Sequence, residues 1–371
     1  MNRTRLLLFV FVFASVVTAH ADDVDDWVKS EMQVRHVPAI SIAVVKDGVL
    51  VKAEAYGVSD IEHNIAAHPN TVFKIGSTSK QFLAAGIMIL VQDGKIAVDE
   101  KLGKYLDGVP DAWNAISIRH LLTHTSGLAR EAPGFDPYKI QPDIDVIKSA
   151  YPVALRAKPG DQYEYSNLGY YVLAEVIHRV SGKAWDDFLK ERIFIPLGMN
   201  STRSTTVAEI VTNRASGYIW SNDIYSNAEN WPAVRPSGAF LSTASDMAKW
   251  EIALQSDRIL TPELKKQMWT PVKLNNGSEY PYGFGWEVDH FPNGVPPTGV
   301  PMIRHEGSMP GFRAVYWRLP DQKITVIVLS NLQSAAVDKL TAGIALRYDR
   351  TLLPAYQKRW PDQLEFPFPR D

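Results

Sequence analysis

Hydrophobic and β-branched residues gather in runs near both ends of the chain, which is typical of β-strands. Ala39 to Val45 and Val49 to Tyr56 are two such runs, and Lys46-Asp47-Gly48 between them carries the Asp-Gly pair that favours a tight antiparallel hairpin. Arg313 to Leu319 and Ile324 to Leu329 flank a Pro-Asp-Gln turn in the same way. The sequence therefore predicts one hairpin near each end.

The middle of the chain shows the longer spacing of amphipathic helices. From Ser77 to about Lys190 the pattern is mostly helical, and Tyr170 to Val180 is a clear amphipathic segment. Further helices are predicted for Asp25 to His36 and Ser334 to Tyr348, and Thr243-Ala244-Ser245-Asp246 predicts another helix start of the capping-box type. The simplest assembly is an α+β fold: an antiparallel sheet built from both termini, flanked by helices, plus a mostly helical inserted region.

Two further segments are relevant to a substrate pocket. Ser201 to Pro236 is polar and aromatic and is expected to be a long irregular loop, which either walls a pocket or packs its rings onto the body. Tyr282 to Val288 predicts a strand, and its glycines permit the close approach of another backbone.

Composition narrows the classes of function. The chain has 371 residues, 46% of them hydrophobic, and a formal net charge of −2 with both signs spread along it. This balance argues against nucleic-acid binding and favours a small molecule or a peptide as the partner. The chain has no cysteine, which excludes a thiol nucleophile and a disulfide. The sequence leaves the oligomeric state open.

The first residues resemble a targeting segment. Arg3 and Arg5 give a basic start, Leu6 to Val17 an apolar core, and Ala19-His20-Ala21 a cleavage site of the small-x-small type. We therefore expect residues 1–21 to be a signal peptide cut after Ala21, with an uncleaved anchor as the alternative. The expected location is periplasmic or secreted, without stable membrane insertion after cleavage.

Ser77 and Lys80 form a Ser-x-x-Lys pair at the start of a predicted helix, just before the apolar run Phe82 to Val91. Residues three apart lie on one helical face, which suits a nucleophilic hydroxyl and the base that removes its proton. The helix N-terminus adds backbone donors for an anionic intermediate. The pair alone is weak evidence, because Ser77 could be a helix cap and Lys80 a solvated side chain.

His120 and His124 lie four residues apart, which raises the question of a metal site. No glutamate stands between them in the zincin arrangement, and no third ligand is evident. Structural histidines are the better interpretation, so we expect neither a metal nor an organic cofactor.

Two further motifs strengthen the Ser-x-x-Lys signal. Tyr165-Ser166-Asn167 precedes a predicted helix, and His305-Glu306-Gly307-Ser308 precedes the last hairpin. In this order the three motifs resemble the serine penicillin-recognising hydrolases, which are class C β-lactamases, D-alanyl-D-alanine carboxypeptidases, D-aminopeptidases and related esterases. The resemblance covers nearly the whole chain beyond the leader, including His120 to Leu128, Pro236 to Asp246 and Tyr282 to Trp286.

The resemblance implies a β-lactamase/transpeptidase-like fold and a set of roles. Ser77 would be the acylated nucleophile, and Lys80 and Tyr165 would share the work of general base and general acid. Asn167 would hydrogen-bond the acyl side of the substrate. A second copy of the tripeptide, Tyr225-Ser226-Asn227, is the weaker candidate because it lies in an Asn-rich segment without a following amphipathic helix.

The last motif would line the substrate site. The resemblance implies that the N–H groups of Ser77 and Ser308 form the oxyanion hole, and that Gly307 lets the strand approach the substrate. His305 stands where class C β-lactamases carry lysine and resembles the peptidase and esterase branches. Glu306 departs from the usual threonine; if it faces the substrate, its charge would repel a substrate carboxylate.

These expectations combine into one hypothesis. Residues 22–371 would form a single catalytic domain, with an α/β part at about 22–76 and 283–371 and a mostly helical part at about 77–282. The protein would be an exported serine hydrolase that forms an acyl-enzyme on an ester, amide, peptide or β-lactam bond. Esterase or D-amino-acid peptidase activity is favoured over efficient β-lactamase activity. The alternative is a penicillin-binding or cell-wall-sensing module with little turnover; an α/β-hydrolase is disfavoured because no Gly-x-Ser-x-Gly motif is present.

Overall fold

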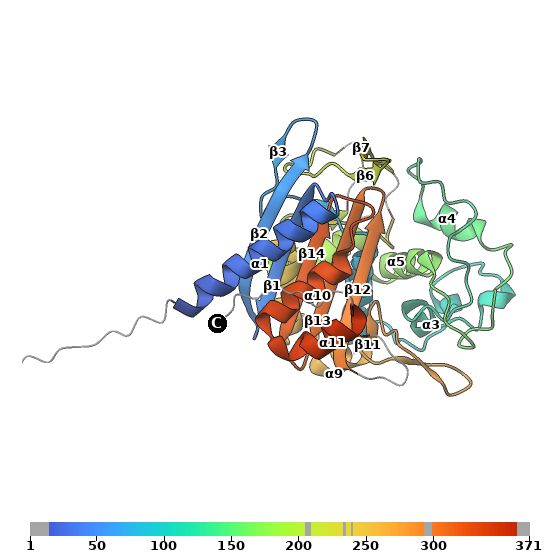
Figure 1. Ribbon diagram of the computed structural model, residues 1–371. Helices are drawn as coiled ribbons and strands as arrows, with labels where there is room; N and C mark the ends of the chain where they lie inside the picture. Colours follow the sequence, from blue (N-terminus) through green and yellow to red (C-terminus); the bar gives the residue numbers. More distant parts are fainter. Residues whose placement is uncertain (1–14, 205–208, 233–234, 239, 293–298, 362–371) are drawn as a thin grey trace, which may run out of the picture.

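A computed structural model describes residues 15–204, 209–232, 235–238, 240–292 and 299–361. Its centre is a seven-stranded antiparallel sheet in the order β11-β12-β13-β14-β1-β2-β3, which joins strands from both ends of the chain (Figure 1). These strands span Glu287–Phe291 (β11), Val300–Met309 (β12), Phe312–Leu319 (β13), Ile324–Ser330 (β14), Ala39–Lys46 (β1), Val49–Asp60 (β2) and Ile65–Ala66 (β3). The predicted α+β class and the sheet built from both termini are confirmed.

The two predicted hairpins are both present. Asp47 and Gly48 join β1 to β2 with φ angles of +50° and +77°, the left-handed conformation that a tight two-residue hairpin turn requires. The hairpin of β13 and β14 pairs with the first one through β14 and β1, where Ile40 lies opposite Ser330. The two ends of the chain thereby share one buried sheet.

Helices from the two ends of the chain cover one face of the sheet. They are α1 (Ser15–Val34), α10 (Val337–Tyr348) and α11 (Leu353–Arg359), and Figure 1 shows α1 and α10 lying across the strands. The Trp27 indole of α1 is buried and donates to the Leu340 carbonyl at 3.2 Å. A buried ion pair joins Glu31 of α1 to Lys339 at 2.8 Å.

The inserted helical region lies beyond the β12 side of the sheet (Figure 1). Its central helices are α2 (Lys80–Gln92) and α5 (Asn167–Ser181), whereas α8 (Ala244–Leu254) packs against β1 and β14 of the sheet. The α2 side chains from Lys80 to Leu90 are all buried, because apolar residues occupy every face of this helix. The α5 helix begins where the Ser166 hydroxyl accepts the Gly169 N–H at 3.0 Å.

Shorter elements complete the fold. The α-helices are α3 (Ile118–Leu122), α4 (Asp143–Ser149), α6 (Trp185–Leu189), α7 (Ile195–Leu197) and α9 (Pro262–Met268). Further turns are η1 (Gly76–Ser79), η2 (Leu102–Lys104), η3 (Asp111–Trp113), η4 (Lys190–Phe194) and η5 (Arg350–Leu352). The remaining strands are β4 (Phe73–Lys74), β5 (Arg203–Ser204), β6 (Tyr218–Ser221), β7 (Ile224–Asn227), β8 (Phe240–Ser242), β9 (Val272–Lys273) and β10 (Glu279–Tyr280).

Two sequence predictions about local structure are corrected. The strand expected at residues 282–288 begins only at Glu287, because the preceding chain curves against α2: a Cβ on Gly285, at φ +74°, would lie 2.9 Å from the Lys80 carbonyl oxygen. The expected irregular loop at 201–236 contains a hairpin of β6 and β7, whose turn residues Asn222 and Asp223 both adopt positive φ.

The predicted signal peptide, residues 1–21, lies mostly outside the described residues; α1 begins at Ser15. None of the helices in the described ranges combines the length and the apolar character that a membrane span requires.

Candidate active site

Ser77 lies on the 3₁₀ turn η1, directly before α2, at the edge of a cleft of about 530 Å³. Gly76 precedes it with φ +53°, and a Cβ on this glycine would lie 2.5 Å from the Ser308 nitrogen. The turn therefore packs directly against β12, and both serines line the cleft. This places Ser77 and Ser308 side by side, as an oxyanion hole requires.

Lys80 is completely buried and its amine makes three polar contacts. Nζ lies 2.8 Å from Asn167 Oδ1, 2.8 Å from the Ser237 carbonyl oxygen and 3.2 Å from Ser77 Oγ. An unprotonated amine has two N–H donors and one lone pair. Asn167 and Ser237 accept the two donors, so the lone pair is left for the Ser77 hydroxyl, which is the arrangement of a general base and its nucleophile.

The surroundings of Lys80 favour this unprotonated form. Burial lowers the pKa of Lys80 well below its ordinary value of 10.5, and the nearby guanidinium of Arg235 lowers it further, while Glu131 opposes the shift. A buried lysine without an adjacent carboxylate in contact loses its proton more readily. The amine can therefore lose its proton at a lower pH than an ordinary lysine and then accept one from Ser77.

Tyr165 lies beside these two residues. Its ring lies under the Lys80 amine, with 4.6 Å between Nζ and the ring centroid. Burial raises the pKa of Tyr165 above its ordinary value of 10, and a hydrogen bond with Ser77 opposes this shift. The phenol thus keeps its proton near neutral pH and reaches the Ser77 hydroxyl. The structure therefore brings Ser77, Lys80 and Tyr165 together.

Asn167 connects the lysine to an ion pair that sequence reasoning missed. Its Oδ1 accepts from Lys80, and its Nδ2 donates to Glu131 Oε1 at 2.5 Å. Both Glu131 oxygens also accept from Arg235 Nη2, at 2.8 Å. Asn167 lines the cleft, but its amide is already held on both sides, so it orients Lys80 as well as facing a substrate.

Sequence patterns carry little signal for Glu131, Arg130 and Arg235. Arg130 and Glu131 follow the segment Ser126-Gly127-Leu128, and Arg235 precedes Pro236, so each adjoins a stretch that resembles the family. Arg130 and Glu131 are adjacent and belong to no recognised motif, and Arg235 is 104 positions further along the chain than Glu131. Only the folded structure places the three charged residues along one cleft. Arg130 lies 5.0 Å from the Tyr165 ring centroid.

Behind Tyr165 lies a row of buried polar groups. The His124 ring packs against the Tyr165 ring, with 4.2 Å between the centroids. His124 Nδ1 accepts the Ser166 N–H at 3.0 Å, so its Nε2 carries the proton and donates to the Tyr282 hydroxyl at 3.2 Å. Tyr282 in turn donates to His305 Nε2 at 2.9 Å. The four groups form one consistently oriented chain of hydrogen bonds.

His305 therefore occupies a supporting position instead of the expected substrate-facing one. Its ring is 2% exposed, does not line the cleft, and donates from Nδ1 to the Glu306 carbonyl at 2.7 Å. Burial lowers the pKa of His305 to about 3, so the ring is neutral. The reason is its direction: alternation along β12 turns the side chain toward Tyr282.

Glu306 and Gly307 also differ from the sequence expectation. Glu306 lies on the opposite face of β12, 3.0 Å from the Arg304 guanidinium and beside Asp338 of α10, and it does not line the cleft. The predicted repulsion of a substrate carboxylate by Glu306 therefore loses its structural basis. A Cβ on Gly307 would lie 1.9 Å from the Ile75 carbonyl oxygen, so this glycine permits close packing of β12 on the turn that carries Ser77.

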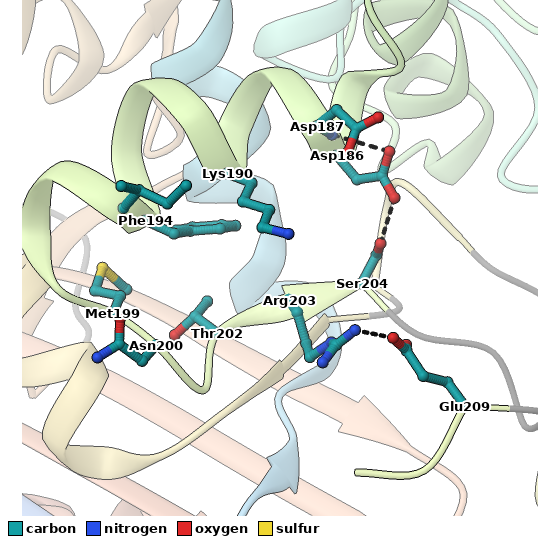
Figure 2. Close-up of a pocket in the computed structure, with 11 residues that line it drawn as sticks. Asp186, Asp187, Lys190, Phe194, Met199, Asn200, Thr202, Arg203, Ser204 and Glu209 are labelled. Carbon is teal, nitrogen blue, oxygen red and sulfur yellow. Dashed lines mark hydrogen bonds and ion pairs between the residues drawn. The ribbon is translucent and has the colours of Figure 1, made fainter.

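Another cavity, of about 370 Å³, lies beside α6 and β5 and is shown in Figure 2. Some of its polar groups pair with one another: Ser204 donates to Asp186 at 2.5 Å, and Arg203 pairs with Glu209. None of the predicted site residues lines it. In the described residues no cluster of three or more His, Asp or Glu is arranged to hold a metal ion. The cleft at Ser77 is thus the candidate active site.

The large antiparallel sheet with its helical insertion defines a protein of the β-lactamase/transpeptidase-like fold. A family model described as Beta-lactamase matches residues 24–348, and the chain belongs to this family. The likeness seen in the three motifs is thereby confirmed at the level of the family.

Known relatives agree with this placement. Penicillin-binding protein 4* of Bacillus subtilis (strain 168) is 30% identical over 313 residues, which cover 78% of this chain and 67% of the relative. The octameric penicillin-binding protein homologue from Pyrococcus abyssi superposes with a TM-score of 0.77 at 26% identity, covering 93% of this chain and 82% of that one. The chain spans about two thirds of the length of the curated relatives it matches.

The fold is also that of an amide-cleaving enzyme. D-amino acid amidase from Ochrobactrum anthropi SV3 has a TM-score of 0.74 at 22% identity, covering 90% of this chain and 99% of that one. At this identity the likeness shows the fold alone.

Proposed function

We propose that this protein is a serine hydrolase that works through an acyl-enzyme at Ser77. The observation that carries the proposal is the environment of the Lys80 amine. Two fixed acceptors, Asn167 Oδ1 and the Ser237 carbonyl, take its two N–H groups and leave its lone pair for the Ser77 hydroxyl. Burial favours the neutral amine that this geometry requires.

The reaction follows from these positions. Ser77 Oγ bonds to the substrate carbonyl carbon while its proton passes to Lys80 Nζ, and the backbone N–H groups of Ser77 and Ser308 hold the developing oxyanion. The leaving group takes a proton from the phenol of Tyr165, which Lys80 then reprotonates. Water next attacks the acyl carbon, the bond to Ser77 breaks, and the proton returns to the serine oxygen.

The substrate bond is an ester, amide, peptide or β-lactam bond. Relatives named as penicillin-binding proteins and a structural neighbour that is a D-amino acid amidase support acyl compounds built from D-amino acids. Residues 1–21 have the character of a signal peptide, which supports an exported enzyme that meets such compounds outside the cytoplasm. The cleft is lined by both charged and apolar groups, which suits a small peptide-like molecule.

Intact-mass measurement of covalent adducts tests the proposal. The protein is mixed with a panel of short-chain esters, β-lactams and D-amino-acid amides, and adducts are compared between wild type, Ser77→Ala and Ser226→Ala. The last variant is a matched control because Ser226 lies on the exposed strand β7. We expect an adduct in wild type and Ser226→Ala and none in Ser77→Ala. Labelling that persists in Ser77→Ala would exclude Ser77 as the nucleophile.

The names of the penicillin-binding relatives also support a second candidate, a module that is acylated but turns over little. Steady-state product release distinguishes the two. One equivalent of product without further turnover would favour the binding module, whereas continued release from the same adduct favours the hydrolase.

A further inference from the structure

A second cavity adjoins the candidate active site. It has a volume of about 400 Å³ and lies between β4, the β6–β7 hairpin and the start of β13. Glu229 and Pro310 line both this cavity and the cleft at Ser77, so the two spaces meet at these residues. We call it the β4 cavity. A molecule bound at Ser77 can therefore extend into it.

The β4 cavity contains two cationic side chains, Lys74 and Arg214. Lys74 is 7% exposed, and its Nζ donates to Asn230 Oδ1 at 2.9 Å and lies 5.7 Å from the Phe312 ring centroid. Arg214 is half-buried, and its guanidinium has no hydrogen-bond partner within the described residues. Neither cation forms an ion pair with any residue that the structure describes.

Glu229, the carboxylate that lines this cavity, already has a hydrogen-bond partner. Glu229 lies where the two spaces meet, and its carboxylate accepts the Trp231 Nε1–H at 2.9 Å. The two cations thus share a partly buried space without a carboxylate in contact with either of them. Burial and the charge of Arg214 lower the pKa of Lys74 to about 8, which is the electrostatic cost of this arrangement.

We propose that the β4 cavity is a substrate subsite for an anionic group, a carboxylate or a phosphate carried by the substrate at a distance from the bond that Ser77 cleaves. This inference rests on the proposed function. Lys74 and Ser77 are three positions apart in the sequence, so their Cα atoms lie at most about 11 Å apart. An oxyanion between Lys74 and Arg214 would satisfy the open donors of both and remove their mutual repulsion.

The proposal reverses the preference that the sequence suggested. Glu306 in the substrate site would have disfavoured an anionic substrate, but its carboxylate lies on the far face of β12. The charged groups that border the β4 cavity are Lys74, Arg214 and Glu229, and the Glu229 carboxylate already accepts the Trp231 Nε1–H. We therefore expect the enzyme to prefer acyl compounds that carry an anion over matched neutral ones.

Matched substrate pairs test this preference. Each pair keeps the scissile ester constant and differs in one distal group: a carboxylate or its neutral methyl ester, and a phosphate or a hydroxyl. The distal group is placed on the acyl part in one series and on the leaving group in another. The measured quantity is the ratio of kcat/KM for the anionic member to kcat/KM for the neutral member, which cancels general losses of activity.

We expect this ratio to exceed one in wild type and to fall at least tenfold in Arg214→Gln and in Lys74→Gln. Lys95→Gln is the control, because Lys95 is exposed after α2 and should leave the ratio unchanged. Carboxylate and phosphate pairs show which anion is preferred. Should the buried Lys74 not tolerate substitution, the half-buried Arg214 still provides the test. A ratio of one or below in wild type for every pair, or a ratio unchanged in both cavity variants, overturns the proposal.

A binding measurement separates this inference from the proposed function. Calorimetric affinities of the same pairs are measured for Ser77→Ala, with and without Arg214→Gln. We expect the anionic member to bind at least tenfold tighter and to lose this advantage with Arg214→Gln. Equal affinities of the two members for Ser77→Ala contradict the anion subsite even where the wild type hydrolyses both, whereas absent hydrolysis with preserved preference contradicts only the proposed reaction.

Discussion

The chain contains the tripeptide Tyr-Ser-Asn twice, and the two copies have different surroundings. In the copy at residues 165–167, the half-buried tyrosine lies beside Ser77, the serine caps α5, and the asparagine contacts Lys80. In the copy at residues 225–227, all three side chains are exposed on β7. There the Tyr225 hydroxyl donates to the His36 carbonyl at 2.8 Å.

The comparison shows that the residues around the tripeptide in space, and not the tripeptide itself, determine whether it can take part in catalysis. Burial raises the pKa of both Tyr165 and Tyr225, so a shifted pKa does not distinguish the copies. What distinguishes them is contact: Tyr165 lies against an amine and a hydroxyl, whereas Tyr225 packs on the Trp220 ring with 4.5 Å between the centroids. A proton can move between acid and base only in the first setting.

Removal of the two phenol hydroxyls gives the largest expected contrast. We expect Tyr165→Phe to lower kcat by about 10³-fold, because a positioned acid or base typically contributes about 10²- to 10⁴-fold. The kcat of Tyr225→Phe should stay within about twofold of wild type, because the Tyr225 hydroxyl bonds only to the His36 carbonyl, which does not line the cleft. Steady-state rates on an ester substrate measure both.

Thermal unfolding of the two tyrosine variants is the control for misfolding. If Tyr165→Phe retained full activity, or if Tyr225→Phe lost as much as Tyr165→Phe, the assignment of the acid to residue 165 would be wrong.

The protonation of Lys80 gives the next contrast. Because burial holds the pKa of Lys80 well below 10.5, kcat/KM should rise with pH as this amine loses its proton and then reach a plateau. Below that pKa the rate should fall about tenfold per pH unit, since the protonated amine has no lone pair for Ser77. The raised pKa of Tyr165 places any alkaline loss above pH 10. A pH profile with an uncharged ester measures both limbs.

The profile of Tyr225→Phe should overlay that of wild type throughout. An acid limb centred at or above 10.5, the ordinary value for lysine, would show that the amine is not depressed by its site and would remove it as the base.

The two asparagines provide a smaller contrast. Asn167→Ala removes the Oδ1 that accepts from Lys80, leaving a buried N–H without a partner at a cost of about 1–3 kcal/mol. We expect kcat/KM to fall about tenfold and the acid limb to shift, because the amine is no longer oriented. Asn227 lines the β4 cavity, so its control uses an uncharged ester without a distal anion, for which Asn227→Ala should change neither quantity. Equal profiles for the two variants would contradict the orienting role of Asn167.

The sequence was sufficient to predict the fold class and the order of the motifs, because these depend on signals between residues that are close together in the chain. The Asp47-Gly48 turn, the Ser166 cap and the apolar face of α5 each signal their own structure through nearby residues. The proximity of Tyr165 to Ser77 and Lys80 follows from the family resemblance. The periodicity of the sequence predicts local elements and does not tell which distant residues come together.

The parts that the sequence did not predict depend on side-chain direction across long distances. Alternation predicts that Glu306 and His305 face opposite ways but not which face of β12 meets the cleft. The ion pair of Glu131 with Arg235 joins residues 104 positions apart and carries no local signal. Gly307 was predicted to let β12 approach a substrate; in the structure the group that approaches this glycine is the Ile75 carbonyl.

Breaking the row of hydrogen bonds behind Tyr165 should change the rate less than the variants of Tyr165 and Asn167 do, but it should clearly lower the free energy of unfolding. Tyr282→Phe removes the hydroxyl that joins His124 to His305, so two buried rings each lose a partner, and we expect the free energy of unfolding to fall by about 1–3 kcal/mol. Tyr225→Phe, whose hydroxyl lies at the surface, should cost about 1 kcal/mol or less. Urea unfolding measures both variants, and kcat of Tyr282→Phe should fall less than tenfold because Tyr165 keeps its hydroxyl. If Tyr282→Phe were no less stable than Tyr225→Phe, the buried chain of hydrogen bonds would contribute nothing to holding Tyr165, and its place beside Ser77 would have to come from packing alone.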